Sequence, residues 1–423
     1  MTCPAPRPRP IGALGLAALL GLSACPGSGA DDEGDDADEG GETVGQGDDW
    51  CLDVGFDPGE ALGAVGREVL APLPSQVADV TCTPDTWAGP DTPQLAPTWT
   101  VILDEFRPFG GSRMVAHPEG GVVIVAPNLF TRVSDNGDIA WAQSGGYLEL
   151  SGLALTMDPD GTILVGASSW SEPSPDPVER FDGQGNSLGA ANIPFASPNA
   201  EIWGLSFDGE DLLVACFDNT MDDFQAPTLL RVAPDGTELL RKASFQVSPG
   251  PLAVTTDGQV LFGNFMLSAT TGAVVGQLTL SDSGFPNAAS TAGEDLWVAG
   301  SGADLTLAKV SGFNVERSLD AHDRYGASDR ARDVATTPDG GAVIVGRQRI
   351  PSTPFDLEWT DDHAVIIGAD ADGNALWIDR PAVYAEATNV AVSSDGAVYV
   401  MGFAEPVDGN PDAAPRWLRR YDP

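Results

Sequence analysis

One pattern that occurs seven times along the chain constrains the fold more than any other feature. Each copy holds two short apolar runs joined by a turn of Pro, Asp, Asn or Gly, as in residues 333–346 (DVATTPDGGAVIVG). The other copies are residues 114–126, 153–166, 204–216, 252–263, 289–300 and 390–402. Apolar alternation on both sides of such a turn predicts a β-hairpin. The closing residues of successive copies are 37 to 56 positions apart, with a mean of 46, and this period predicts propeller blades.

A second, weaker hairpin follows the first within the repeat. Examples are residues 129–142, 178–189, 229–240 and 365–378, so each repeat should supply four strands. The seventh repeat stops one strand short, because only two residues follow its third strand at 416–421 (RWLRRY). An unmatched run near the N-terminus, residues 98–103 (TWTVIL), carries a Trp, as do the fourth strands at Trp141 and Trp377. We therefore expect this N-terminal strand to close the ring in the last blade.

The composition supports the same fold class. With 42% hydrophobic residues, 50 Gly and 34 Pro among 423 residues, the chain favours a large core and many turns over long helices. The expected architecture is an all-β, seven-bladed β-propeller of four-stranded antiparallel blades over residues 97–423. Its repeat resembles the NHL-like and quinoprotein-like propellers of secreted bacterial proteins. Quinoprotein dehydrogenases hold a quinone against a Trp beside calcium-binding acids, and that set does not map onto this sequence.

The charge balance excludes one class of partner. The chain has 62 acidic and 21 basic residues, which gives a net charge of -41. Such a surface repels phosphate backbones, so we expect no nucleic-acid partner. We interpret the acidity as a means of solubility, and the expected state is a monomer.

The N-terminus has the pattern of a lipoprotein signal peptide. Arg7 and Arg9 precede an apolar run over residues 11–22 that is too short to span a membrane, and Leu-Ser-Ala-Cys ends at Cys25. This ending resembles the lipobox of bacterial lipoproteins. The resemblance implies cleavage after residue 24 and an acylated Cys25 that anchors the protein in a membrane. Because Pro26 replaces the Asp that retains such proteins in the inner membrane, the expected location is the cell envelope, at the outer membrane. An ordinary secretory signal remains the alternative.

Two further segments precede the propeller. Residues 25–49 should be a disordered tether, since ten acids lie between residues 31 and 49 without a base. Residues 50–96 lie outside the repeat and should form a small extension that packs on the propeller. Cys51 and Cys82 in this extension should form a disulfide, as expected outside the cytoplasm. Cys216 closes a strand where a small residue packs, so it should be a buried thiol.

A search for catalytic motifs assigns no catalytic residue, metal or cofactor. The three histidines fall in different repeats, and His117 occupies a hairpin-turn position. The long loops, among them residues 347–363, should all lie on one face of the ring, where exposed aromatic residues favour a binding surface. Its candidate residues are Trp170, Phe224, Phe355, Trp359, Tyr325 and His322. In the alternative, these aromatic side chains fold back and cover the blades.

Two classes of function follow. The first is a membrane-anchored, non-catalytic binding or scaffold lipoprotein that presents the loop face to a protein or glycan partner. The second is a propeller enzyme, namely a hydrolase, a lyase or a quinone-dependent dehydrogenase, with its site at the channel mouth. Converging His, Arg and Asp side chains around a concave mouth would favour the enzyme, and a flat aromatic rim would favour the binder.

Overall fold

The computed structural model describes most of the repeat region and little of the N-terminal quarter. The described residues are 76–77, 92–103, 112–126, 129–143, 152–158, 160–168, 177–197, 200–218, 227–243, 250–279, 286–301, 305–311, 314–321, 330–353, 356–381, 385–404 and 416–423. All belong to one compact unit, residues 62–423. Every element within these ranges is a β-strand, and no helix there could span a bilayer.

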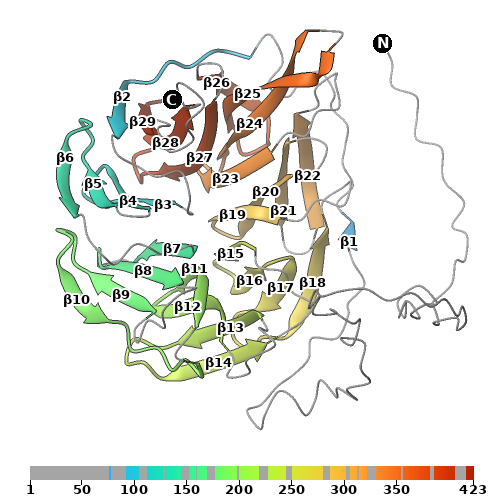
Figure 1. The fold of residues 1–423 in the computed structure, drawn as a ribbon. Coiled ribbons are helices and arrows are strands. Elements are labelled where there is room, and N and C mark those ends of the chain that lie inside the picture. Colours follow the sequence, from blue (N-terminus) through green and yellow to red (C-terminus); the bar gives the residue numbers. More distant parts are fainter. Residues whose placement is uncertain are drawn as a thin grey trace, which may run out of the picture. The chain divides into compact units, whose positions relative to one another are not determined.

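Seven sheets surround a common centre, which makes the protein an all-β, seven-bladed propeller (Figure 1). Blade 1 contains β3 (Arg113–Ala116), β4 (Val122–Ala126), β5 (Leu129–Val133) and β6 (Ile139–Gln143). Blade 2 contains β7 (Gly152–Met157), β8 (Ile163–Ser168), β9 (Val178–Phe181) and β10 (Ser187–Ala190). Blade 3 contains β11 (Glu201–Asp208), β12 (Asp211–Phe217), β13 (Pro227–Val232) and β14 (Glu238–Ala243). Blade 4 contains β15 (Leu252–Val254), β16 (Gln259–Phe262), β17 (Phe265–Ser268) and β18 (Val274–Thr279). Blade 5 contains β19 (Pro286–Ala292), β20 (Asp295–Ser301), β21 (Leu305–Ser311) and β22 (Asn314–Ala321). Blade 6 contains β23 (Arg330–Thr336), β24 (Ala342–Thr353), β25 (Asp356–Ala369) and β26 (Ala375–Asp379). Blade 7 contains β27 (Ala385–Val392), β28 (Val398–Ala404), β29 (Arg416–Tyr421) and, as its fourth strand, β2 (Trp99–Leu103).

The hairpin turns form where the sequence supplies glycine. Between β23 and β24, the Thr337 N–H donates to Gly341 O and the Gly340 N–H donates to Thr337 O, each at 3.0 Å. Gly340 has a φ of 88°, which an L side chain rarely adopts. The Pro-Asp-Gly-Gly sequence therefore fixes the hairpin register and, with it, which side chains of the two strands face the core.

The described part of the core consists of seven apolar clusters, one between each pair of neighbouring blades. The second strand of a blade contributes to the clusters on both of its sides, because both of its faces are covered. In β4, for example, all five residues are buried, with Ile124 facing blade 7 and Val123 facing blade 2. This two-sided burial explains why the second run of each repeat is continuously apolar in the sequence.

The N-terminal strand closes the ring as the sequence indicates. Strand β2 pairs antiparallel with β29, from Trp99 opposite Arg420 to Leu103 opposite Arg416. Asp135, in the turn between β5 and β6 of blade 1, receives hydrogen bonds from blade 7. Its carbonyl accepts from the Trp99 indole and from an Arg420 guanidinium nitrogen, both at 2.7 Å. The prediction of ring closure by residues 98–103 is therefore confirmed.

Parts of the N-terminal extension lie against the outer strands. Gln76–Val77 forms β1, which pairs parallel to β18 as a fifth strand of blade 4. Gln94 bridges to Ile378 of β26 in blade 6, and the Leu95 N–H donates to the Ile378 carbonyl at 2.9 Å. These contacts place two described parts of the 50–96 segment on the rim of the propeller.

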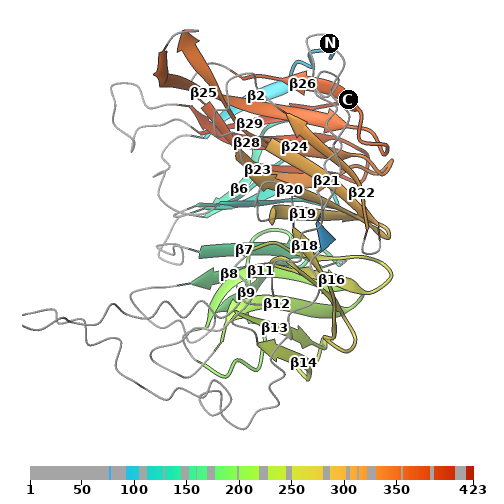
Figure 2. The same ribbon diagram turned by 90° about the vertical axis from the view of Figure 1, so that its right-hand side faces the viewer.

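One segment that was expected to be a loop forms two paired strands in the structure. Residues 347–363, expected to form an open loop, continue the strands β24 and β25 as a hairpin that pairs as far as Thr353 opposite Asp356. Beyond Arg347 this hairpin has no further pairing to β23, and its return strand meets β26 only from Ile366 onward. Figure 2 shows the end of the hairpin projecting beyond the other described strands of its blade.

Candidate functional site

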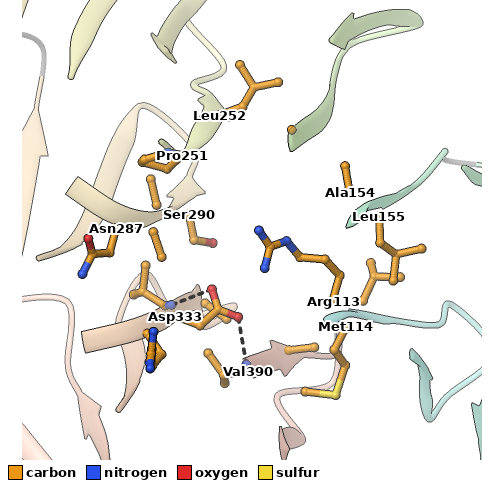
Figure 3. Close-up of a pocket in the computed structure, with 18 of the residues that line it drawn as sticks. Arg113, Met114, Ala154, Leu155, Pro251, Leu252, Asn287, Ser290, Asp333 and Val390 are labelled. Carbon is orange, nitrogen blue, oxygen red and sulfur yellow. Dashed lines mark hydrogen bonds between the residues drawn. The ribbon is translucent and has the colours of Figure 1, made fainter. Parts of the chain in front are cut away.

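The inner strands of all seven blades enclose a central cavity of about 630 Å³. It is lined by residues of β3, β7, β11, β15, β19, β23 and β27, so it lies on the axis of the ring. Its size is within the range of sites for small molecules. Figure 3 shows apolar side chains such as Leu155 and Leu252 on its walls, with a few polar groups between them.

Bulges in the inner strands place several of these polar groups. The ladder register shifts between Pro286 and Ala288 in β19, and between Ala331 and Asp333 in β23. The extra residues at these two bulges, Asn287 and Arg332, both line the cavity. A bulge re-aims a side chain that regular alternation would send elsewhere, which is why bulges occur near functional sites.

Arg113 is the most prominent charged group in the cavity. Its side chain is exposed and extends from β3 into the open space, as Figure 3 shows. One guanidinium nitrogen donates to the carbonyl of Ser112 at 3.1 Å. Ser112 is itself held by Asn389 of blade 7, whose amide donates to the same carbonyl at 2.9 Å and accepts from the Ser112 hydroxyl at 2.8 Å. Among the described residues, no carboxylate lies within ion-pair distance of Arg113.

Asp333 lines the same cavity, on the side toward which the Arg113 guanidinium extends (Figure 3). One carboxylate oxygen accepts the N–H of Val334 at 2.9 Å, and the other accepts the N–H of Val390 from blade 7 at 3.0 Å. The carboxylate touches the cavity but is enclosed by protein on its other sides. This burial raises the pKa of Asp333 to about 6, although the two N–H groups and the positive charge of Arg113 act in the opposite direction.

The second arginine of the cavity is already paired. The Arg332 Nε donates to the Glu386 carboxylate of β27, and the Glu386 side chain is only 6% exposed. This pair joins blades 6 and 7. Of the two arginines in the described lining, Arg113 is thus the one without an ion-pair partner.

His117 lies away from the cavity and acts as a turn residue, as expected. Its Nδ1 accepts the N–H of Glu119 at 3.1 Å, so this nitrogen carries no proton and the ring is neutral. The side chain is buried, and this burial lowers the pKa of His117, with a smaller contribution from the charge of Arg132. His363 lies at the base of the β24–β25 hairpin, opposite Gln348, and does not line the cavity either.

Most of the rim residues singled out by the sequence lie outside the described residues. These are Trp170, Phe224, Phe355, Tyr325 and His322, together with Cys25, Cys51 and Cys82 of the N-terminal segments. Trp359 is part of strand β25 rather than of a loop. The expected buried thiol is confirmed: Cys216 is fully buried and free, and burial raises the pKa of its thiol well above the usual value.

The cavity residues were missed by sequence analysis. Arg332 and Asp333 lie in the first strand of the hairpin repeat at residues 333–346, where charged residues stand beside Val334 and Ala335. Those charged residues were the available signal. Within the described ranges, no group of three His, Cys, Asp or Glu side chains is close enough together to hold a metal ion.

Comparison with known proteins identifies the fold alone. No known protein family and no curated protein matches the sequence. A chain from the crystal structure of a mitotic checkpoint complex matches with a TM-score of 0.53 and 12% identity, covering 84% of this chain and 99% of that one. A protein of unknown function from Bacteroides caccae matches with a TM-score of 0.41 and 16% identity, over 64% of this chain and 93% of its own. At 12% identity, the first likeness shows a shared propeller architecture and nothing about function.

Proposed function

We propose that this protein is a membrane-anchored, non-catalytic binding lipoprotein of the cell envelope, whose propeller rim engages a protein or glycan partner. The observation that carries the proposal is the projecting hairpin of blade 6. Strands β24 and β25 are 12 and 14 residues long. The middle strands of the other six blades, as the structure describes them, are four to seven residues long.

The projecting part of the hairpin is suited to recognition by its position. Between Gln348 and His363 its two strands pair with each other and with no other described strand. A two-stranded ribbon on a rigid scaffold offers free backbone edges and two faces of side chains to a partner. Trp359 and Phe355 belong to this segment, and aromatic residues dominate the binding energy of many interfaces.

The N-terminal sequence supplies the cellular context of the proposal. A signal peptide over residues 1–24, a lipid-bearing Cys25 and an acidic tether over residues 25–49 would hold the propeller away from the outer membrane. The rim would then be free to meet other envelope components. A Cys51–Cys82 disulfide would stabilise the extension that precedes the ring.

The test compares three variants of the mature protein. In the first, Trp359 and Phe355 are both replaced by Ala. In the second, residues 348–363 are replaced by Gly-Asn, the turn that joins β16 to β17 in blade 4. The control is Ile139→Ala, which removes a side chain that is 58% exposed on a distant outer strand.

Each variant is assayed for binding to arrayed envelope glycans and for site-specific cross-linking to envelope proteins in cells. We expect both hairpin variants to lose binding while keeping the melting temperature of the wild type, and the control to keep both. Hairpin variants that bind as the wild type does would overturn the proposal. A large loss of melting temperature in the Trp359→Ala, Phe355→Ala double variant would instead support aromatic side chains that fold back on the blades.

The central cavity supports a second candidate, an enzyme acting on a small molecule. The supporting observation is the convergence of Arg113, Arg332 and Asp333 on one concave space. A hydrolase, a lyase or a quinone-dependent dehydrogenase would use this space. For the quinone-dependent class, the described lining offers one carboxylate beside two guanidinium groups, which does not fit a calcium-held cofactor. Turnover of ester, glycoside or uronate substrates that is lost in Asp333→Asn would favour this candidate.

A further inference from the structure

We propose that the central cavity binds a small monocarboxylate that carries an amino or hydroxyl group on the carbon next to its carboxylate. In this proposal Arg113 takes the carboxylate, and Asp333 accepts a hydrogen bond from the neighbouring group. The site is separate from the hairpin of blade 6, so the proposal stands independently of the function proposed for the rim.

The first step concerns the free arginine. The Arg113 guanidinium extends into the cavity with one donor used by Ser112 O and no carboxylate partner among the described residues. A guanidinium presents donors in a planar fork, which matches the two oxygens of a carboxylate. The Ser112–Asn389 hydrogen bonds fix the backbone from which Arg113 starts. The Arg113 guanidinium can therefore bind an anion that is not part of the protein.

The second step limits the charge of that anion. Arg332 is paired with Glu386, so among the described lining residues Arg113 is the guanidinium without an ion-pair partner. Asp333 brings a carboxylate to the same space and would repel the second charge of a dicarboxylate or a phosphate dianion. The arrangement therefore favours an anion with a single charge.

The third step gives the neighbouring donor. Each carboxylate oxygen has about two acceptor sites, and the backbone N–H groups of Val334 and Val390 use one on each oxygen of Asp333. A buried carboxylate with remaining acceptor sites is stabilised by any further donor that reaches it. An ammonium or hydroxyl group next to the bound carboxylate of the ligand supplies that donor.

The fourth step concerns the remainder of the ligand. Pro251, Leu252 and Leu155 give the cavity apolar walls beside its polar groups (Figure 3). A volume of about 630 Å³ leaves room for a side chain of several carbon atoms. Both 2-amino acids and 2-hydroxy acids have this shared chemistry, and the experiment separates them.

The test is calorimetric titration of the folded mature protein with L-leucine, L-2-hydroxyisocaproate, 4-methylpentanoate and 2-isobutylsuccinate. The first two carry the amino or hydroxyl donor on the same carbon skeleton. The third lacks the donor, and the fourth has a second carboxylate in its place. We expect one of the first two to bind with a Kd of about 1 mM or tighter, and the other two to bind at least about tenfold more weakly.

Two variants locate the site. Arg113→Met should weaken the preferred ligand by about tenfold to a hundredfold, because a charge-assisted bidentate pair is lost. Arg180→Met is the matched control, since Arg180 is an exposed arginine on β9 away from the cavity. Asp333→Asn should remove the preference for the donor-bearing ligand over 4-methylpentanoate. Circular dichroism establishes that each variant is folded before titration.

Three outcomes would overturn the proposal. The first is that the wild type binds none of the four compounds at concentrations up to about 10 mM. The second is that Arg113→Met binds the preferred compound as the wild type does. The third is that the dicarboxylate binds as tightly as the preferred compound, because the charge of Asp333 would then not weaken the binding of a doubly charged anion.

Discussion

Replacing Asp135 with Ala tests the hydrogen bonds that join the last blade to the first. The Asp135 carboxylate accepts the Tyr399 hydroxyl of β28 and, at 2.7 Å, the N–H of Gly121. The Tyr399 side chain is fully buried, so the variant leaves its hydroxyl without an acceptor. A buried donor that loses its partner costs about 1 to 3 kcal/mol, and the lost Gly121 bond adds about 1 kcal/mol. We therefore expect a loss of about 2 to 4 kcal/mol.

A double-mutant cycle with Tyr399→Phe separates this bond from other effects. Tyr399→Phe removes both the hydroxyl and its need for an acceptor, so alone it should cost about 1 kcal/mol. In the double variant no orphaned hydroxyl remains, and its cost should fall short of the sum of the single variants by about 1 kcal/mol or more. Asp138→Ala is the control, because Asp138 lies in the same turn with an exposed side chain.

The assay is urea unfolding followed by far-UV circular dichroism and by Trp fluorescence. Coincidence of the two transitions is the requirement for comparing free energies of unfolding. Strictly additive costs for Asp135→Ala and Tyr399→Phe would refute the coupling, and a cost for Asp138→Ala equal to that of Asp135→Ala would refute the role of this carboxylate.

Three further predictions concern protonation and the cysteines. The pKa of His117 is lowered in the folded protein, so the unfolded state binds the proton more tightly and stability should decline as the pH falls through about 6.5; His117→Asn, which keeps a turn acceptor, should lose less melting temperature between neutral and acidic pH, and an equal loss would contradict the assignment. Mass spectrometry of protein extracted from membranes should find acyl chains on an N-terminal Cys25, and an unmodified or differently cleaved N-terminus would disprove the lipobox. Non-reducing peptide mapping should find Cys51 joined to Cys82, whereas a bridge involving Cys216 would show that the extension is misread.

The fold was predictable because the apolar runs, the turn residues and the repeat length all indicate the same structure. Continuous apolar runs such as Val122–Ala126 mark strands covered on both faces, and glycines such as Gly340 mark the turns between them. The missing fourth strand of blade 7 and the unmatched strand at Trp99 together indicated how the ring closes. These signals are local or repeat along the chain, so one sequence suffices to detect them.

The projecting hairpin was not predictable from the same signals. Residues 347–363 contain Pro351 and Pro354, which disfavour central strands. In the structure the paired ribbon lies outside the blade, where Pro is tolerated, and its register is irregular between Pro351 and Thr353. A segment whose prolines indicate a loop can therefore form a paired ribbon where its two strands extend beyond the blade.

The cavity was hidden for a different reason. Arg113 and Asp333 lie in blades 1 and 6, and no spacing rule connects residues so far apart in the chain. Asn287 and Arg332 reach the cavity because each is the extra residue of a β-bulge. A bulge changes the register of a strand without changing its apolar pattern, so the sequence does not reveal it. Only the closed ring brings these groups together.

Closure of the ring by β2 is the central claim, and two N-terminal truncations that differ by one strand test it most directly. A chain beginning at residue 98 keeps β2, and a chain beginning at residue 104 lacks it. Loss of the strand withdraws Trp99 and Leu103 from the cluster between blades 7 and 1, at about 2 kcal/mol for each side chain. With about 2 °C of melting temperature for each kcal/mol, the shorter chain should melt about 8 °C or more below the longer one. Equal melting temperatures for the two chains would contradict closure of the ring by β2.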